Sequence, residues 1–251
     1  MLTKRIIACM DVRAGQVVKG VQFQQLRHAG DPAELAERYN VEGIDEVVIL
    51  DITATLESRQ ALAETINAVA HRIFLPLTVG GGIRSEDDAA AAVDAGADKV
   101  SLNTAALNNP ALITTLARRY GSQAVIVAID AKRRGDGFAV YVRSGTSDAA
   151  RDAVEWARDA ESCGAGEILL TSMDRDGTRS GFDCEMTAAV ANAVNIPVIA
   201  SGGAGGLDHF RDVFTRGHAD AALAASIFHY ADTSVSELKR YLRDKNIPVR
   251  M

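Results

Sequence analysis

The sequence predicts an α/β fold, a single (β/α)8 (TIM) barrel over residues 1–251, built from two similar half-barrels at about 1–122 and 123–251. Three observations support this prediction. Eight short apolar runs alternate with amphipathic stretches, an internal repeat recurs after about 120 residues, and the chain of 251 residues suits one such barrel. A doubly wound open sheet is the alternative, but eight strands without a Pro/Gly/Ser linker favour the closed barrel.

Eight apolar runs predict the strands of the barrel. Each run is nearly continuous in its apolar character, as expected for parallel strands that are buried on both faces. The runs are RIIACM (5–10), EVVIL (46–50), LPLTV (75–79), KVSLN (99–103), AVIVAI (124–129), EILLT (167–171), IPVIA (196–200) and AALAA (221–225).

The segments between these runs have helical features. Leu62, Ile66 and Val69 recur at the i, i+4, i+7 spacing that places side chains on one face of a helix. Asp31 followed by Pro32 predicts a helix start, with a capping side chain and a proline at the first helical position.

The two halves of the chain repeat each other. PLTVGGG (76–82) matches PVIASGG (197–203), and GIDEVVIL (43–50) matches GAGEILLT (164–171), both at an offset of 121 residues. A period of this length is too long for a solenoid repeat. It indicates two half-barrels of four β/α units each.

Glycine-rich turns follow the third and seventh runs, on the side of the barrel where active sites lie. Glycines let backbone N–H groups approach an anion closely, and the next helix N-terminus adds the positive end of its dipole. The bland interpretation is a pair of tight turns, but their recurrence at the same repeat position favours a ligand with two phosphates. The predicted binding residues are Gly81, Gly82, Asn103, Thr104, Thr171, Asp176, Gly177, Ser201, Gly202, Gly203, Ala225 and Ser226.

Two carboxylates end opposite strands of the predicted barrel. Asp11 ends the first run and Asp130 ends the fifth, so both are expected to face one pocket. Such a pair can divide general-acid and general-base work if their environments separate the two pKa values. Which residue is the acid and which the base stays open. Asp51, which ends the second run, is a weaker candidate that would either bind a ribose hydroxyl or take part in the chemistry.

Two segments on the same side of the barrel are longer than ordinary βα loops. Residues 12–30 lack helical periodicity and suggest an active-site lid, in which Lys19 is either a mobile cation for an anionic substrate or a solvated surface lysine. Residues 131–147 predict a hairpin inserted after the fifth strand.

Strand alternation predicts a second group of inward side chains, at the amino-terminal mouth of the barrel. If Asp11 faces inward, so does Arg5, six residues earlier. If Asn103 and Thr171 face inward, so do Lys99 and Glu167, each four residues earlier, and Glu46 shares its parity with Leu50. The cluster is either a structural plug or a gate or docking surface, and a buried ion cluster is a poor way to gain stability. Its predicted members are Arg5, Glu46, Lys99 and Glu167.

Composition narrows the possible functions. A net charge of −6 argues against binding of nucleic acid or of an anionic membrane surface. No apolar run reaches the roughly 20 residues of a membrane span, and the stretch before Asp11 has too few apolar residues to predict a signal segment. The 3 cysteines and 5 histidines are scattered, which indicates reduced thiols in a cytoplasmic protein and no metal site.

Several strings identify a family that the chain resembles from end to end. They are KRIIACMDV (4–12), VGGGIRS (79–85), DKVSLNTAA (98–106), VAIDAK (127–132), GAGEILLTSMDRDGT (164–178), ASGGAG (200–205) and ALAASIFH (222–229). These strings resemble the cyclase subunits of imidazole glycerol phosphate synthase, from histidine biosynthesis.

This resemblance implies a reaction without a metal or an organic cofactor. Ammonia would react with the doubly phosphorylated substrate PRFAR to give imidazole glycerol phosphate and AICAR. Asp11 and Asp130 match the acid/base pair of that family, and Lys19 matches the lysine of its lid. The four mouth residues match a gate for ammonia from a glutaminase subunit bound as a heterodimer, and Asp98 matches a position at that interface. One residue is inserted near His218, so that the phosphate-binding serine falls at Ser226.

Two rival functions remain open at this point. The sister barrel, an aldose-ketose isomerase that catalyses the preceding step of the same pathway, has the same two phosphate turns and paired aspartates. A catalytically dead barrel that only activates a partner is a rival of another class, and intact Asp11 and Asp130 count against it.

Overall fold

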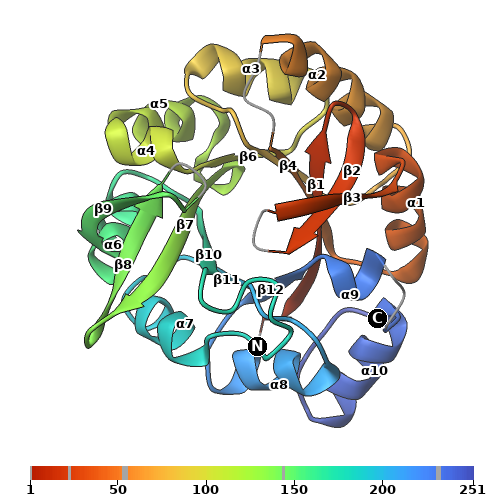
Figure 1. Ribbon diagram of the computed structural model, residues 1–251, viewed down its shortest axis with the longest axis vertical. Coiled ribbons are helices and arrows are strands. Elements are labelled where there is room, and N and C mark those ends of the chain that lie inside the picture. The colour runs from red at the N-terminus through yellow and green to blue at the C-terminus, as the bar shows by residue number, and fades with distance from the viewer. Residues whose placement is uncertain (1, 22–23, 53–55, 143–144, 230–232) are drawn as a thin grey trace.

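Eight parallel strands close into a barrel that is surrounded by helices (Figure 1). The computed structural model describes the backbone of residues 2–21, 24–52, 56–142, 145–229 and 233–251, and their side chains except those of 19–21, 24–29, 56–60 and 229. The pairing of β7 with β10 closes the sheet. The barrel strands are β1 (Arg5–Arg13), β4 (Glu46–Asp51), β5 (Leu77–Gly80), β6 (Lys99–Leu102), β7 (Val125–Arg134), β10 (Glu167–Ser172), β11 (Val198–Ser201) and β12 (Ala221–Ala224).

Every predicted apolar run overlaps one of these strands, so the prediction of a (β/α)8 barrel is confirmed. Three strands begin later than predicted: β7 by one residue, β5 after Pro76 and β11 after Pro197. Proline has no N–H for a sheet hydrogen bond. Each of these prolines still accepts a bond through its carbonyl, from Val47 and Ile168 of the preceding strands.

Helices follow the strands and cover the outside of the barrel (Figure 1). The predicted start at Asp31 is confirmed, because the Asp31 carboxylate accepts hydrogen bonds from the amides of Ala33 and Glu34 at 2.9 and 3.0 Å. The helices are α1 (Pro32–Glu42), α2 (Leu56–Ala70), α3 (Glu86–Asp94), α4 (Thr104–Asn108), α5 (Ala111–Tyr120), α6 (Ala153–Ser162), α7 (Cys184–Ala191), α8 (Leu207–Thr215), α9 (Ser226–His229) and α10 (Val235–Asp244), with the 3-10 turn η1 (Ser122–Ala124).

Alternate residues of the strands build two separate cores. One set of side chains packs outward against the helices in a large cluster, and the other set fills the barrel. Small and medium apolar side chains line the middle of the barrel between its two ends. The buried members of this inner cluster are Ile7, Cys9, Val48, Ile126, Leu169, Ile199, Ala221 and Leu223.

Two antiparallel hairpins extend from the carboxyl end of the barrel. The long non-helical segment predicted over residues 12–30 contains the strands β2 (Gln16–Val21) and β3 (Gln24–Gly30), which continue the antiparallel pairing from β1. Val17, Val18 and Val21 explain this outcome, since β-branched residues favour strands. The role of this segment as a lid stays a prediction. The side chain of Lys19 lies outside the described residues. Figure 1 shows this hairpin in front of the barrel mouth.

The second insertion matches its prediction. β7 runs on to Arg134 and turns into β8 (Gly137–Val142), which gives the hairpin expected over residues 131–147. A further strand, β9 (Ser147–Asp152), pairs with β8 beyond the predicted end.

A buried ion pair fastens the last helix to the beginning of the barrel. Lys239 of α10 lies 2.8 Å from the carboxylate of Asp45, with both side chains at most 4% exposed, and it also donates to the carbonyl of Gly43 at 2.6 Å. The second oxygen of Asp45 accepts from the Ile6 amide at 2.8 Å. The pair therefore links α10, the entry to β4, and β1.

Loss of Lys239 is expected to destabilise the fold strongly. Lys239→Met would leave the Asp45 carboxylate buried without its cation, which typically costs about 3–5 kcal/mol. Urea unfolding measures this loss, with Arg240→Met as the control because Arg240 is exposed on the same helix. A loss of unfolding free energy below about 1 kcal/mol for Lys239→Met would contradict the proposed cost of leaving Asp45 buried without its cation.

Candidate active site at the carboxyl end of the barrel

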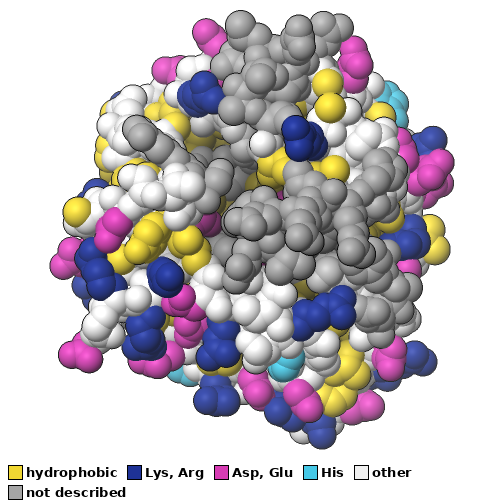
Figure 2. Space-filling model, viewed as in Figure 1, with side chains coloured by type: hydrophobic (Ala, Val, Ile, Leu, Met, Phe, Trp, Pro, Cys, Tyr) yellow, Lys and Arg dark blue, Asp and Glu magenta, His cyan; other side chains and the backbone are white. Residues whose placement is uncertain are grey.

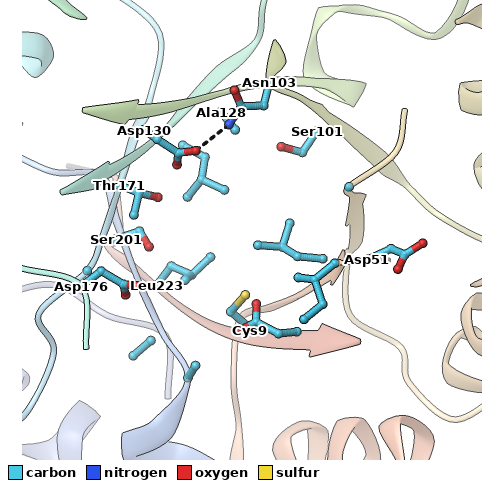
Figure 3. Close-up of a pocket in the computed structure, with 18 of the residues that line it drawn as sticks. Cys9, Asp51, Ser101, Asn103, Ala128, Asp130, Thr171, Asp176, Ser201 and Leu223 are labelled. Carbon is cyan, nitrogen blue, oxygen red and sulfur yellow. Dashed lines mark hydrogen bonds between the residues drawn. The ribbon is translucent and has the colours of Figure 1, made fainter. Parts of the chain in front are cut away.

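One pocket of about 640 Å³ opens at the carboxyl ends of the barrel strands. Figure 3 shows side chains from strands on all sides of the barrel converging on it. The predicted catalytic and binding residues all line it: Asp11, Asp51, Gly81, Gly82, Asn103, Thr104, Asp130, Thr171, Asp176, Gly177, Ser201, Gly202, Gly203, Ala225 and Ser226. The structure therefore brings together in one place residues that are spread over most of the chain.

The two glycine turns have the same local geometry. Gly81 and Gly202 have φ values of +84° and +91°, a conformation that L side chains rarely adopt. A Cβ atom at Gly81 would lie 2.0 Å from the carbonyl oxygen of Asp51, and one at Gly202 would lie 2.7 Å from that of Ser172. Asp51 and Ser172 hold equivalent positions in the repeat, so both turns pack directly on the neighbouring strand end.

A short helix stands beside each turn. α4 begins at Thr104, after β6, and α9 begins at Ser226, after β12. The first N–H groups of a helix have no acceptor within it and point outward from its start. Glycine turns next to the start of a short extra helix are the usual arrangement of phosphate sites in barrels of this kind.

Asp130 lies on the wall of the pocket and has an unusual acidity. Burial raises its pKa from 3.8 to about 6; a hydrogen bond from Asn103 acts in the opposite direction, and the charge of Asp176 adds to the rise. Asn103 Nδ2 donates to Asp130 Oδ2 at 2.9 Å (Figure 3). A carboxyl group with a pKa near 6 can both accept and donate a proton close to neutral pH.

Asp11 enters the pocket from the other side of the barrel. It belongs to β1, the first barrel strand, and Asp130 belongs to β7, the fifth, so three strands lie between them in either direction around the barrel. Cys9, one inward position earlier on β1, and Asp130 lie on opposite sides of the pocket (Figure 3). Asp51 also lies across the pocket from Asp130 and Asp176. A substrate that spans the pocket would meet one carboxylate at each side.

Four charged side chains meet at the opposite end of the barrel. Arg5 donates to Glu167 at 2.7 and 3.2 Å and to Glu46 at 2.9 Å. Lys99 donates to Glu167 at 2.8 Å and to Glu46 at 3.0 and 3.2 Å. Each cation therefore contacts both anions, and the predicted cluster forms a closed ring across the barrel axis.

The cations of the ring favour the ionised form of Glu167. Burial alone would raise the pKa of Glu167, but the hydrogen bonds and charges of Arg5 and then Lys99 outweigh it, so the pKa is lowered. Glu46, with a side chain 1% exposed, accepts a further bond from Thr78 at 2.8 Å. Asp98 lies at the rim, exposed, with one carboxylate oxygen 2.8 Å from the Leu77 amide.

Three polar residues of the pocket were missed by the sequence predictions. Ser101 faces inward two residues before Asn103, and the strand parity that identified Lys99 could have found it. Arg84 and Arg179 also line the pocket. Their positions, two residues after the Gly82 and Gly177 turns, are the only signal that the sequence offered.

The described residues form no group of three or more His, Cys, Asp or Glu side chains that could hold a metal ion. Within the same residues, no helix is long and apolar enough to cross a membrane.

The closed barrel, its paired glycine turns and its opposed carboxylates define a (β/α)8-barrel enzyme. A family model described as histidine biosynthesis protein matches residues 5–234. The chain is 62% identical over 251 residues to imidazole glycerol phosphate synthase subunit HisF of Acidobacterium capsulatum, covering 100% of this chain and 99% of that protein. Identities to the proteins of the same name are 58% over 250 residues in Metallosphaera sedula and 55% over 251 residues in Alkaliphilus metalliredigens, covering 100% of each chain.

The chain therefore belongs to the histidine biosynthesis protein family and, within it, to the cyclase subunits of imidazole glycerol phosphate synthase.

The raised pKa of Asp130 predicts that Asp130→Asn stabilises the protein. The folded state keeps Asp130 protonated up to about pH 6 and the unfolded state only up to about 3.8, so ionisation destabilises the fold as pH rises through this range. Asparagine never ionises, so the variant should be more stable at pH 8, by up to about 3 kcal/mol. Urea unfolding from pH 8 down to pH 4 should show this difference disappear.

Asp136→Asn is the matched control, because Asp136 is exposed at the tip of the β7–β8 hairpin. Equal stability of Asp130→Asn and the wild type at pH 8 would mean that burial of Asp130 carries no ionisation cost.

Proposed function

We propose that the protein uses ammonia to convert PRFAR into imidazole glycerol phosphate and AICAR. The single observation that supports this most strongly is the pocket itself, which has a phosphate turn on either side and a carboxylate at either end of the reacting region. PRFAR has a phosphate at each end, so one turn is available for each. The shared name of the full-length relatives favours this reaction over the isomerisation of the preceding step.

The proposed chemistry needs proton transfers and no metal or organic cofactor. Asp130, with a pKa of about 6, would exchange a proton with the reacting centre near neutral pH, and Asn103 would hold the carboxylate in place. Asp11 would carry out the complementary proton transfer from the opposite strand of the barrel. Lys19 would close over the bound anion as a cation of the β2–β3 hairpin.

We further propose that ammonia enters through the charged mouth from a glutaminase subunit, with which the chain forms a heterodimer. The ring of Arg5, Glu46, Lys99 and Glu167 spans the barrel axis at the end opposite the pocket. An ion ring is a weak source of stability, so a role in the passage of ammonia explains the ring better than a structural role does. Separation of Lys99 from its two glutamates would open the ring.

The distribution of exposed apolar side chains supports docking at this mouth. Among the described residues, four of the five exposed large hydrophobic side chains lie at the amino-terminal end of the barrel: Leu2, Val41, Phe74 and Met251. Phe74 is 96% exposed and lines, together with Asp98, a depression of about 380 Å³. Exposed apolar groups gathered at one face mark an interaction site. We place this complex in the cytoplasm, in agreement with three free cysteines.

Incubation of the purified protein with PRFAR and an ammonium salt is expected to yield AICAR. Asp130→Asn should abolish this turnover, because asparagine cannot exchange a proton, while PRFAR affinity stays within a few-fold of wild type. Release of AICAR measures the turnover, and calorimetric titration measures the affinity for PRFAR. Near-wild-type turnover of the variant would remove Asp130 from the chemistry, and isomerisation of the preceding intermediate would favour the sister enzyme.

Changes at the mouth are expected to separate the two nitrogen sources. Phe74→Ala and Asp98→Lys should weaken glutaminase binding by tenfold or more, as for a central aromatic or a charged partner contact. They should reduce glutamine-dependent turnover with little effect on turnover with free ammonia.

Asp136→Lys, a charge reversal at the other end of the barrel, is the control for these variants. Equal losses with glutamine and with ammonia would refute a docking role for this face. Lys99→Ala tests the ring itself and should likewise affect glutamine-dependent turnover more.

A further inference from the structure

Two arginines line the pocket and have no part in the mechanism above. Among the described residues, Arg84 and Arg179 are the cationic side chains of its wall. The same wall contains the carboxylates of Asp11, Asp51 and Asp130, together with Asp176. A ligand with two phosphates therefore meets a pocket rich in negative groups, on a chain whose net charge is −6. Figure 2 shows basic and acidic side chains interspersed over the described part of this face. Because this surface is mixed in charge, a phosphorylated ligand would depend on cations within the pocket.

Arg84 extends from the first phosphate turn. It follows Gly82 by two residues, and its side chain is exposed. Its amide donates to Asp88 at 2.9 Å, and Ser85 caps α3 by accepting from the Asp88 amide at 3.2 Å. These contacts fix the backbone of Arg84 beside the turn, while its exposed side chain lines the pocket.

The second turn has no arginine at the equivalent position. The internal repeat aligns Arg84 with Gly205. A Cβ atom at Gly205 would lie 2.4 Å from the carbonyl oxygen of Arg179 and 2.8 Å from its Cβ. At the next residue, Gly206, an added Cβ would meet nothing within 4 Å. Glycine is thus required at position 205 because the backbone of Arg179 occupies the space beside it.

The loop that bears Arg179 is held tightly in this position. Gly181 donates from its amide to Gly203, in the second turn, at 2.8 Å. Thr178 and Ser180 share a hydrogen bond at 2.7 Å on either side of Arg179. Arg179 itself has a φ of +56°, which is uncommon for a residue other than glycine. Strained conformations of this kind persist where the surroundings impose them, often at ligand sites.

We propose that each phosphate turn has one arginine of its own, Arg84 for the turn at 80–82 and Arg179 for the turn at 201–203. The two half-barrels supply this cation from different loops. Glycine at position 205, where the first half has Arg84, leaves room for the backbone of Arg179. A guanidinium pairs with two phosphate oxygens through parallel hydrogen bonds, which suits a fixed anion site. The proposal rests on the two-phosphate substrate of the proposed function and names residues that bind it.

Inorganic phosphate tests the two sites separately. Titration of the isotope-labelled protein should shift the amide resonances of Gly82 and Gly203 in the wild type. Arg84→Gln should weaken the phosphate response at Gly82 by about tenfold to a hundredfold, the loss expected for charge-assisted hydrogen bonds, and leave Gly203 unchanged. Arg179→Gln should do the reverse. Arg118→Gln, a change on the exposed face of α5, controls for net charge.

The glycines offer a second, matched pair of variants. Gly205→Ala should displace Arg179 and weaken phosphate binding at Gly203 alone, whereas Gly206→Ala should not, because its Cβ meets open space. Partial recovery in Arg84→Lys and Arg179→Lys would identify the charge as part of the effect. Unchanged phosphate affinity in both glutamine variants, or no response at either turn in the wild type, would overturn the proposal.

Failure of this inference and failure of the proposed function can be distinguished. If PRFAR is not converted but the arginine changes still weaken phosphate binding at their own turns, the proposed function fails and this inference stands. If PRFAR is converted with unchanged KM in both variants, the inference fails and the proposed function stands.

Discussion

The alternation of side chains along closed parallel strands is the constraint on which the rest of this structure depends. In a barrel of eight strands every second side chain must enter the interior, whatever its chemistry. β1 places Arg5, Ile7, Cys9 and Asp11 inside in that order, and β10 places Glu167, Leu169 and Thr171. The charged ring, an apolar layer and the pocket therefore follow one another along the axis. A shift of one residue in any strand would turn these groups toward the helices.

Both ends of the barrel axis contain groups that are costly to bury. The ring contains two glutamates and two cations where apolar side chains would pack as well or better. At the other end, burial of Asp130 opposes its ionisation, and several turn residues adopt left-handed backbone conformations. The large apolar core between strands and helices offsets these costs. The apolar contacts that stabilise the scaffold thus lie mainly between the strands and the surrounding helices.

The internal repeat has different consequences for binding and for catalysis. The turns at Gly81 and Gly202 keep the same backbone geometry and pack on equivalent neighbours. The side chains around them have diverged, with arginine at position 84 and glycine at the equivalent position 205. A substrate with two similar phosphates but otherwise dissimilar ends would suit such a site. Its phosphates can bind to similar turns, whereas the rest of the molecule needs different side chains in each half.

Much of this arrangement could be predicted from the sequence. Apolar runs located the eight strands, and parity from Asp11 and Asn103 identified the inward-facing charges at the far end. The β2–β3 hairpin could not be predicted with equal ease, because its valines lie in a segment without clear alternation. Arg84 and Arg179 escaped notice since exposed arginines are common, and only the space beside Gly205 distinguishes Arg179. That space depends on contacts between loops distant in sequence, which no local pattern encodes.

The most direct test of the central claim is a crystal structure of the Asp130→Asn variant with PRFAR bound. The account predicts one PRFAR molecule across the pocket, with one phosphate against the amides of the turn at 80–82 and the other against those of the turn at 201–203. The reacting centre should then lie between positions 11 and 130. Binding of both phosphates within one half of the barrel, or of PRFAR outside the pocket, would contradict it.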